Sequence, residues 1–194
     1  MKLSDKKMRK KKEDILLSAI KVVNKKGPNG ATMEDIAAEL LMTKGSLYYY
    51  FKNKEDIIFQ CHEMVLTEAT SDIVDCQNGN GTNEEKLLNM IKTHIRYAIE
   101  KKEIFNMMIK PGEMFTEVQL NQILHMRNEY ALKFDETIVK GIASGEFVSE
   151  DPVLTRMMIL GAMNWIQQWY RPNGKKTINE IQEIYAASLL KLLK

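Results

Sequence analysis

The stretch TMEDIAAELLMTKGSLYYYFKNKEDI, residues 32–57, decides the fold of this chain. Thr32 is followed three residues later by Asp35, a spacing typical of a capping box at a helix start, with Asp in place of the usual Glu. After a brief turn, Thr43 can cap a second short helix. Two short helices joined by a tight turn and preceded by a longer helix form a helix-turn-helix, so the stretch predicts this unit.

The aromatic row at residues 48–51 does not follow the 3.6-residue period of a helix with one buried face. We expect Leu47 and Phe51, one turn apart, to face inward against the preceding helix. Tyr48 and Tyr49 would then face outward, where a phenol hydroxyl can donate to a phosphate. The alternative is that residues 48–50 form a buried tyrosine cluster with no role in binding.

In a helix-turn-helix, the second helix enters the major groove of DNA. Gly45 would let the backbone come close to the DNA, and Lys44 and Ser46 can reach base edges or phosphates from the first helical turn. Lys54 opens the next helix, where a cation and the free N–H groups of a helix start favour a phosphate. The residue pattern therefore predicts a DNA-facing surface.

The charge distribution agrees with a polyanionic partner for the N-terminal part. Residues 1–60 hold 13 Lys/Arg and 8 Asp/Glu, whereas the remainder holds 15 and 18. The first twelve residues alone carry seven basic side chains. A basic surface of this kind favours nucleic acid; the alternative, for these twelve residues by themselves, is a solvated, disordered tail.

Outward from the helix-turn-helix, helical signals are dense and strand signals are nearly absent. Caps, prolines and glycines predict about nine helices, near residues 9–26, 33–40, 44–51, 54–76, 84–101, 103–110, 116–144, 152–170 and 178–194. The predicted fold class is therefore all-α. We expect an N-terminal helix-turn-helix DNA-binding domain over residues 1–53, and a C-terminal helical ligand-binding and dimerisation domain over residues 54–194.

Composition limits the class of protein. The 194 residues are 44% hydrophobic, but no apolar run is long enough to span a membrane, and no signal-peptide pattern opens the chain. The two cysteines, Cys61 and Cys76, lack CxxC spacing, which favours free thiols in a reducing compartment. We therefore expect a cytoplasmic protein that makes no membrane contact.

The run GSLYYYFKNK, residues 45–54, within the stretch quoted above, resembles the DNA-binding segment of the TetR family of bacterial transcriptional regulators. The resemblance covers about 50 residues, 10–59. It implies a homodimer on a palindromic or near-palindromic operator in double-stranded DNA. It also implies operator contacts, or positions at helix starts beside phosphates, for Thr32, Thr43, Lys44, Gly45, Ser46, Tyr48, Tyr49 and Lys54.

The two C-terminal helices predict a dimer independently of that resemblance. Apolar residues surround the segment 152–170 almost completely, as in a helix that is buried on all sides. The final helix also carries an apolar face and further leucines outside it. We expect both helices to form a four-helix, two-fold interface with a second copy. A purely intramolecular core is the alternative.

The segments RNEYALKFDETIVKGIASGEF, residues 127–147, and GAMNWIQQWYRPNG, residues 161–174, resemble the ligand domain of the TetR branch that responds to acyl-CoA thioesters. This resemblance, together with an apolar, methionine-rich cluster around residues 111–112, suggests ligand contacts. The candidate residues are Phe105, Met108, Met114, Phe115, Arg127, Asn164, Trp165, Gln168, Trp169 and Arg171.

Each of these candidates has a purely structural alternative. The methionines are equally consistent with plain core. Trp165 and Trp169 could only anchor the dimer, and Asn164 and Gln168 could make hydrogen bonds between helices instead of contacts with a ligand.

The resulting hypothesis is a repressor that a small hydrophobic effector releases from DNA, with an acyl-CoA as one candidate effector. A multidrug-responsive repressor of an efflux pump is an alternative, with Glu113 and Glu117 as the nearest carboxylates for a cationic drug. An architectural DNA-binding protein without an effector is another.

An enzyme or a metal protein is disfavoured. His62, His94 and His125 lie far apart in the sequence, and only Cys61-His62 with Cys76 offers a candidate metal cluster. We therefore expect no catalytic residues, no metal and no cofactor.

Overall fold

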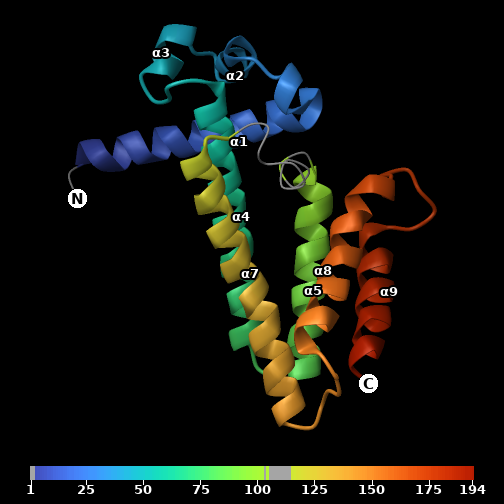
Figure 1. The fold of residues 1–194 in the computed structure, drawn as a ribbon. Helices are drawn as coiled ribbons and strands as arrows, with labels where there is room; N and C mark the ends of the chain where they lie inside the picture. The colour runs from blue at the N-terminus through green and yellow to red at the C-terminus, as the bar shows by residue number, and fades with distance from the viewer. Residues whose placement is uncertain (1–2, 103, 105–114) are drawn as a thin grey trace. The chain divides into compact units, whose positions relative to one another are not determined.

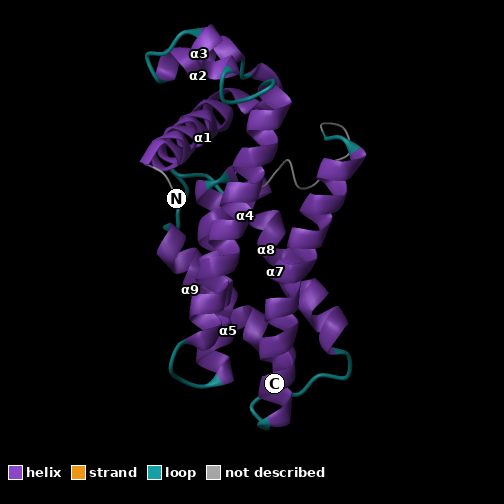
Figure 2. Ribbon diagram, turned by 90° about the vertical axis from the view of Figure 1, so that its left-hand side faces the viewer, coloured by secondary structure: helices purple, strands orange, loops and turns teal. Residues whose placement is uncertain are grey.

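The computed structural model describes residues 3–102, 104 and 115–194, and the elements are labelled in Figure 1. The helices are α1 (Leu3–Gly30), α2 (Met33–Glu39), α3 (Lys44–Tyr48), α4 (Lys54–Asn78), α5 (Asn83–Glu100), α7 (Glu117–Ala143), α8 (Pro152–Trp169), α9 (Ile178–Leu190) and the short 3-10 helix η2 (Lys191–Leu193). Figure 2 shows only helices and loops in these ranges. The all-α prediction is confirmed, and the helix predicted at 103–110 lies, except for residue 104, outside the described residues.

The chain divides into two compact units. The first unit comprises Met1–Val65 and Glu103–Ile123, and the second comprises Leu66–Lys102 and Leu124–Lys194. The long helices α4 and α7 therefore contribute residues to both units. This division differs from the domain boundary expected after residue 53, which stays a prediction. No helix in the described part of the chain is long and apolar enough to cross a membrane.

The predicted caps begin the helices of the first unit. Thr32 Oγ1 accepts the Asp35 N–H at 3.1 Å, and Asp35 Oδ2 accepts the Thr32 N–H at 3.1 Å, which completes the capping box of α2. Thr43 Oγ1 accepts the Ser46 N–H at 3.1 Å and opens α3. Asn53 Oδ1 accepts the Asp56 N–H at 2.8 Å at the start of α4. Local hydrogen bonding therefore fixes where these three helices start.

Helix α1 differs from its expected bounds. It begins at Leu3 rather than near residue 9, so the interpretation of residues 1–12 as a disordered tail is wrong from residue 3 onward. The expected break is present: Gly27 has φ 75° and ψ 163°, a conformation that interrupts the helix and that a side chain disfavours.

The aromatic row is split between the core and the surface, as predicted. Leu47 and Phe51 are buried together with Ile36 of α2, and α2 packs on both α1 and α3. Tyr48 and Tyr49 are 47% and 73% exposed. The alternative of a buried tyrosine cluster is therefore wrong. Because the buried members hold α3 against α2, the outward members are presented on a firmly supported helix.

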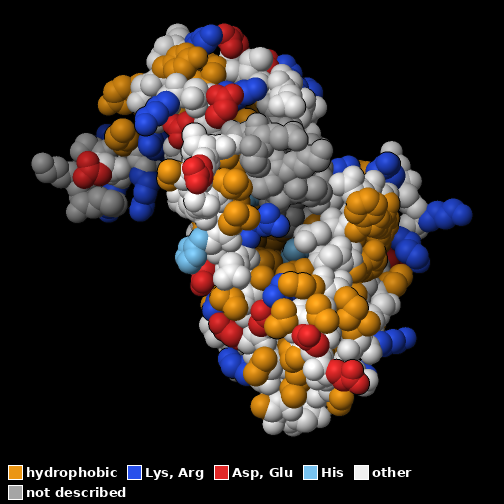
Figure 3. Space-filling model, in the orientation of Figure 1, with side chains coloured by type: hydrophobic (Ala, Val, Ile, Leu, Met, Phe, Trp, Pro, Cys, Tyr) orange, Lys and Arg blue, Asp and Glu red, His pale blue; other side chains and the backbone are white. Residues whose placement is uncertain are grey.

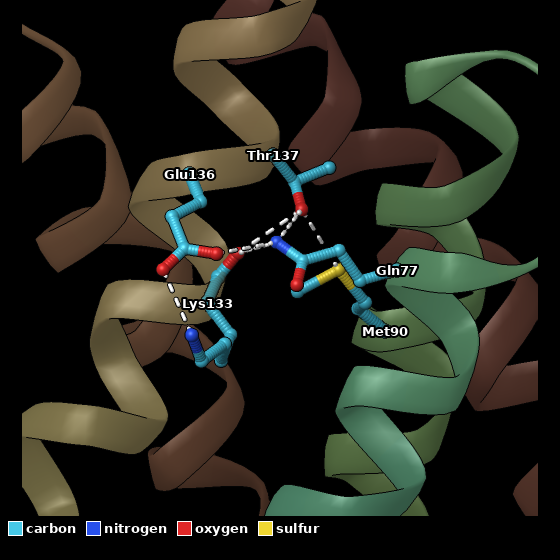
Figure 4. A network of polar contacts seen from close by, with 5 residues as sticks. All are labelled: Gln77, Met90, Lys133, Glu136 and Thr137. Carbon is cyan, nitrogen blue, oxygen red and sulfur yellow. Dashed lines mark hydrogen bonds and ion pairs between the residues drawn. The ribbon is translucent and has the colours of Figure 1, made fainter.

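In the second unit, α5 packs against both α8 and α9. Figure 4 shows how a polar network also joins α4 to α7 in this unit. Gln77 Nε2 donates to the carbonyl of Lys133 at 3.3 Å, to Glu136 Oε2 at 3.0 Å and to Thr137 Oγ1 at 3.3 Å. Thr137 in turn contacts Met90 Sδ at 3.4 Å. The side-chain amide of Gln77 thus links α4 to α7.

Helix α8 starts where the sequence predicts. Asp151 Oδ1 accepts the Leu154 N–H at 2.9 Å, and proline follows at the first helical position. One side of α8 is buried, and its other side carries large apolar residues exposed to solvent: Val153, Leu154, Met157, Met158, Trp165 and Trp169. Figure 3 shows hydrophobic side chains gathered over the surface of this unit. One chain therefore leaves an apolar face of α8 uncovered.

Candidate functional site

The exposed side of α3 forms the candidate nucleic-acid interface. Thr43, Lys44, Gly45, Ser46 and the two outward tyrosines are exposed. A Cβ atom built on Gly45 would meet nothing nearer than Thr43 Oγ1 at 3.9 Å, and its φ is not positive. The fold itself therefore does not require glycine at this position, which points to a requirement outside the chain.

Lys44 is held by α2. Its Nζ pairs with Glu34 Oε1 and lies 5.9 Å from the centroid of the Tyr48 ring. The hydrogen bond to Glu34 raises the pKa of Lys44, and the reciprocal bond lowers the pKa of Glu34. The only cation within α3 is therefore partly neutralised by a carboxylate of the neighbouring helix.

The hydroxyls at this surface also have internal partners. Ser46 Oγ lies 2.9 Å from Thr43 Oγ1, which itself caps α3. Thr32 is engaged in the capping box of α2. Lys26 Nζ lies 2.6 Å from Asp35 Oδ1 and lowers the pKa of that carboxyl. The side chains that would face a phosphate are thus already positioned by the contacts that build the helices.

Cations also lie on α1 and at the start of α4. Lys54 is half-buried at the first position of α4. Figure 3 shows Lys and Arg side chains on the first unit, and the exposed ones near the start of α1 are Lys6, Lys7, Arg9 and Lys10. Lys12 Nζ lies 5.5 Å from the centroid of the buried Phe51 ring, so this part of α1 lies against the core that supports α3.

The second unit contains a polar cluster that joins three helices; His94 and Tyr130 are buried in it, and Asn164 is exposed. His94 of α5 places Nδ1 2.9 Å from the hydroxyl of Tyr130 on α7 and Nε2 3.1 Å from Asn164 Oδ1 on α8. Burial lowers the pKa of His94 to about 4, against a smaller upward effect from Asn164. His94 is therefore neutral at pH 7. Because Asn164 Oδ1 can only accept, Nε2 carries the proton and Nδ1 accepts from Tyr130.

Sequence reasoning named Asn164 but missed its partners. His94 was noted only as one of three separated histidines, although it lies on the apolar stripe of α5 together with Met90, Ile91 and Ile95. A polar residue within such a stripe is the signal that could have identified it, since a buried polar group needs a hydrogen-bond partner.

Among the other ligand candidates that the structure describes, Phe115 belongs to the first unit and the rest belong to the second. Phe105, Met108 and Met114 lie outside the described residues. Phe115 is buried in the first unit, 6.0 Å from Phe59 between ring centroids. Arg127 is half-buried on α7, in the part that belongs to the second unit, and burial lowers its pKa.

The candidates near the end of α8 lie at the surface. Trp165 is 64% exposed, and Trp169 stacks on Tyr185 of α9 with the centroids 6.0 Å apart. Arg171 is exposed, and its Nη1 donates to the carbonyls of Gln168 and Tyr170 at 3.3 and 3.0 Å.

Asn164 is exposed, and so is Gln168. Its neighbour Gln167 is the buried glutamine, and Gln167 Oε1 has no hydrogen-bond partner among the described residues.

The two cysteines named for the metal alternative have different partners. Cys61 is buried, its pKa is raised by burial, and it donates to the Leu16 carbonyl at 3.5 Å. Cys76 instead lies 3.5 Å from Thr93 Oγ1. Within residues 3–102, 104 and 115–194, no three His, Cys, Asp or Glu side chains come close enough to hold a metal ion. Glu117 is exposed, and Glu113 lies outside the described residues.

Two family models match the chain. One is described as "Bacterial regulatory proteins, tetR family" and matches residues 15–61, which contain the second half of α1, all of α2 and α3, and the start of α4. The other is described as "Tetracyclin repressor-like, C-terminal domain" and matches residues 80–193. Together they cover both the candidate nucleic-acid interface and the polar cluster.

Individual proteins agree with the family models. The chain is 25% identical over 163 residues to the fatty acid metabolism regulator protein of Bacillus subtilis (strain 168), with 82% of each chain covered. It is 22% identical over 194 residues to the transcriptional repressor KstR2 of Mycolicibacterium smegmatis, covering 93% of this chain and 89% of that protein. The crystal structure of AibR in complex with isovaleryl coenzyme A and operator DNA has the same fold, with a TM-score of 0.79, 21% identity and coverage of 94% and 97%.

Proposed function

Because this chain belongs to the tetR family of bacterial regulatory proteins and is a DNA-binding transcriptional regulator, we propose that it is a repressor, bound to its operator as a homodimer and released by a small hydrophobic effector. The observation that carries the proposal is the exposed face of α3, a capped helix whose buried side packs on α2 while its polar and aromatic side faces outward.

The proposed operator contacts divide by chemistry. Gly45 lets the backbone of α3 approach the DNA, and Lys44 and Ser46 reach base edges in the major groove. Tyr48, Tyr49 and Lys54 contact the sugar-phosphate backbone, where contacts fix orientation but carry no sequence information. Thr32 and Thr43 place the free N–H groups of two helix starts beside phosphates.

The ion pair between Lys44 and Glu34 competes with the contact between Lys44 and DNA. Lys44 must leave Glu34, or share its charge, when it meets a base or a phosphate. Since an exposed ion pair contributes little to stability, the DNA can displace it. Glu34 therefore weakens binding to every DNA sequence alike, and correct base contacts are needed to compensate for it.

The proposed dimer uses α9 together with the part of the exposed apolar face of α8 that runs from Val153 to Trp165. Large apolar residues at this face, including Leu154, Met157 and Met158, are each more than half exposed in a single chain. A contiguous apolar patch of this kind marks an interface, and a two-fold contact would bury the same patch of both copies. Leu154→Glu should then give monomers in analytical ultracentrifugation, whereas a dimer that persists with this variant would exclude the face.

The proposed effector is an acyl-CoA. Support comes from the name of the Bacillus subtilis relative, which regulates fatty acid metabolism, and from the isovaleryl coenzyme A bound to AibR. Within the second unit, the neutral His94, the Tyr130 hydroxyl and the half-buried Arg127 supply polar contacts beside apolar helices. An apolar cavity with a few polar groups pointing into it can bind an acyl thioester.

The proposed mechanism follows from dimer geometry. The two α3 helices must lie about one DNA turn apart, roughly 34–36 Å, to read both half-sites. An effector that prefers a dimer with another spacing lowers operator affinity, and by linkage the operator lowers effector affinity by the same factor.

A thermal-shift titration tests the ligand class. CoA thioesters of several chain lengths are compared with the corresponding free acids and with cationic drugs. A ligand at 100 times its dissociation constant stabilises the fold by about 2.7 kcal/mol, which raises the Tm by a few degrees. Stabilisation by thioesters supports the proposal, whereas stabilisation by cationic drugs alone would replace it with an efflux-pump repressor.

A further inference from the structure

A pocket of about 460 Å³ lies in the second unit where α8 ends and α9 begins. This volume is within the range of small-molecule sites, about 300–1,000 Å³. Its aromatic wall consists of Trp169, Tyr170 and Tyr185, and Ile181 and Ile184 of α9 complete the apolar surface. We call it the α8–α9 pocket. In Figure 3, hydrophobic side chains lie next to Lys and Arg side chains at this end of the unit.

The rim of the α8–α9 pocket is cationic. Arg171, Lys175 and Lys176 line it and are exposed, and no Asp or Glu belongs to the lining. Arg171 uses Nη1 for the carbonyls at the end of α8; its Nε and Nη2 donors have no partner among the described residues. A guanidinium with donors to spare and two neighbouring ammonium groups suits a phosphate.

Glu180, in the first turn of α9, is already engaged in hydrogen bonds. Glu180 Oε2 accepts the N–H of Thr177 at 2.7 Å and its hydroxyl at 2.8 Å, completing the capping box of α9. The hydrogen bonds from Thr177, and then the charge of Lys176, lower the pKa of Glu180. Glu180 therefore stays ionised for the cap and offsets part of one cation, and an anion at the rim still meets an excess of positive charge.

The aromatic wall offers flat π-faces. The Trp169 and Tyr185 rings are stacked, 6.0 Å apart at 28° between planes, and Trp169 remains 41% exposed. Aromatic faces of this kind stack with any nucleobase. We propose that the α8–α9 pocket binds a planar base that carries phosphate, with adenosine phosphates as the chemical class.

This chemistry has two sources. Coenzyme A carries an adenosine 3′-phosphate and a diphosphate, and a free adenine nucleotide carries the same base and phosphates without an acyl chain. The coenzyme A source rests on the proposed effector, whereas the free nucleotide source does not. In the first case the pocket holds the polar end of the effector, and in the second it is a separate regulatory site.

Isothermal titration of the full chain with adenosine 3′,5′-bisphosphate tests the site. Adenosine alone and inorganic phosphate alone serve as comparison probes, because each supplies half of the proposed recognition. The bisphosphate is expected to bind at least about tenfold more tightly than either. Equal binding of the three probes, or no binding because a second copy covers the pocket, would overturn the proposal.

Matched variants locate the binding. Lys175→Ala/Lys176→Ala is expected to weaken bisphosphate binding about tenfold or more, whereas Lys140→Ala/Lys191→Ala, which removes two exposed lysines elsewhere in the same unit, leaves it unchanged. Trp169→Phe keeps a stacking face and should retain binding, while Trp169→Leu should lose most of it. Binding that is unaffected by the first double variant and by Trp169→Leu would contradict this location.

Coenzyme A and adenosine diphosphate distinguish the two sources. If coenzyme A binds more tightly than adenosine diphosphate, and this advantage is lost in Lys175→Ala/Lys176→Ala, the pocket holds the polar end of the effector. Equal affinities for the two ligands support a free nucleotide. If acyl-CoA still releases the operator from that double variant, this pocket does not bind the coenzyme A part of the effector, but the proposed effector itself is retained. Nucleotide binding without any release of the operator by acyl-CoA would retain the pocket and remove the effector.

Discussion

Lys44 of α3 forms an ion pair with Glu34 of α2, so the cation that we propose for base contact is held by the neighbouring helix. Both side chains are about half exposed. The pair therefore contributes little to stability, and its consequence is for DNA affinity.

Glu34→Gln should raise DNA affinity without a change in thermal stability. The substitution removes the competing carboxylate and leaves Lys44 free to meet the DNA, so binding to operator and to random DNA should both tighten. Fluorescence anisotropy at fixed salt measures this, with Glu39→Gln, an exposed acid at the end of α2, as the matched control. Affinities that match those of the control would show that Glu34 does not restrain Lys44.

Gly45→Ala separates a requirement of the fold from a requirement of DNA. Open space around Gly45 accepts a methyl group, and alanine is favoured over glycine within a helix by up to about 1 kcal/mol. The variant should therefore be as stable as the wild type or slightly more stable, while operator affinity falls by tenfold or more because α3 cannot approach as closely. Retained operator affinity would exclude a close approach at this residue.

Lys54→Ala and Ser46→Ala test the division between phosphate and base contacts. Lys54→Ala should weaken binding to all sequences and reduce the slope of log affinity against log salt by about one unit. Ser46→Ala should leave that slope unchanged and alter the preference among sequences selected from a random pool. An unchanged salt slope for Lys54→Ala would mean that the start of α4 does not contact a phosphate.

The His94 cluster predicts that stability falls in mild acid. Folding lowers the pKa of His94 from its ordinary value of 6.5 to about 4. Below pH 6.5 the unfolded chain binds a proton that the folded chain does not, so the free energy of unfolding decreases as the pH falls, and the loss is complete near pH 4. Between pH 7 and pH 5 the loss is about 2 kcal/mol.

Urea unfolding at pH 7 and pH 5 measures that difference. His94→Gln keeps a polar side chain between Tyr130 and Asn164 but cannot titrate, so its stability should change much less over the same interval. The same carboxyl groups and the other histidines are present in wild type and variant, so their titration cancels in the comparison. An equal loss in wild type and variant would assign the pH dependence to other groups.

Features that depend on residues close together in the sequence were predicted correctly. The caps at Thr32 and Thr43 depend on contacts between residues three apart, and the sequence predicted both. The inward position of Leu47 and the outward position of Tyr49 follow from helical periodicity in the same way.

Features that depend on tertiary packing were missed. His94 meets Tyr130 and Asn164 from helices that are far apart in the sequence, and no local pattern pairs them. The buried glutamine of α8 is Gln167 rather than Gln168, because one residue turns a helix by about 100° and the sequence did not define which side of α8 faces α5. Because α8 has apolar residues on both sides, its sequence pattern did not indicate which side is buried.

The account's central claim is that an effector in the ligand-binding part opposes operator binding by α3. The most direct measurement is the operator dissociation constant, measured by fluorescence anisotropy while the acyl-CoA concentration is raised to saturation. The free acid serves as the control. We predict that the operator dissociation constant rises at least about fivefold with the thioester and reaches a plateau, as linkage between two sites requires. An operator dissociation constant that stays the same, or falls, at saturating acyl-CoA would contradict the claim.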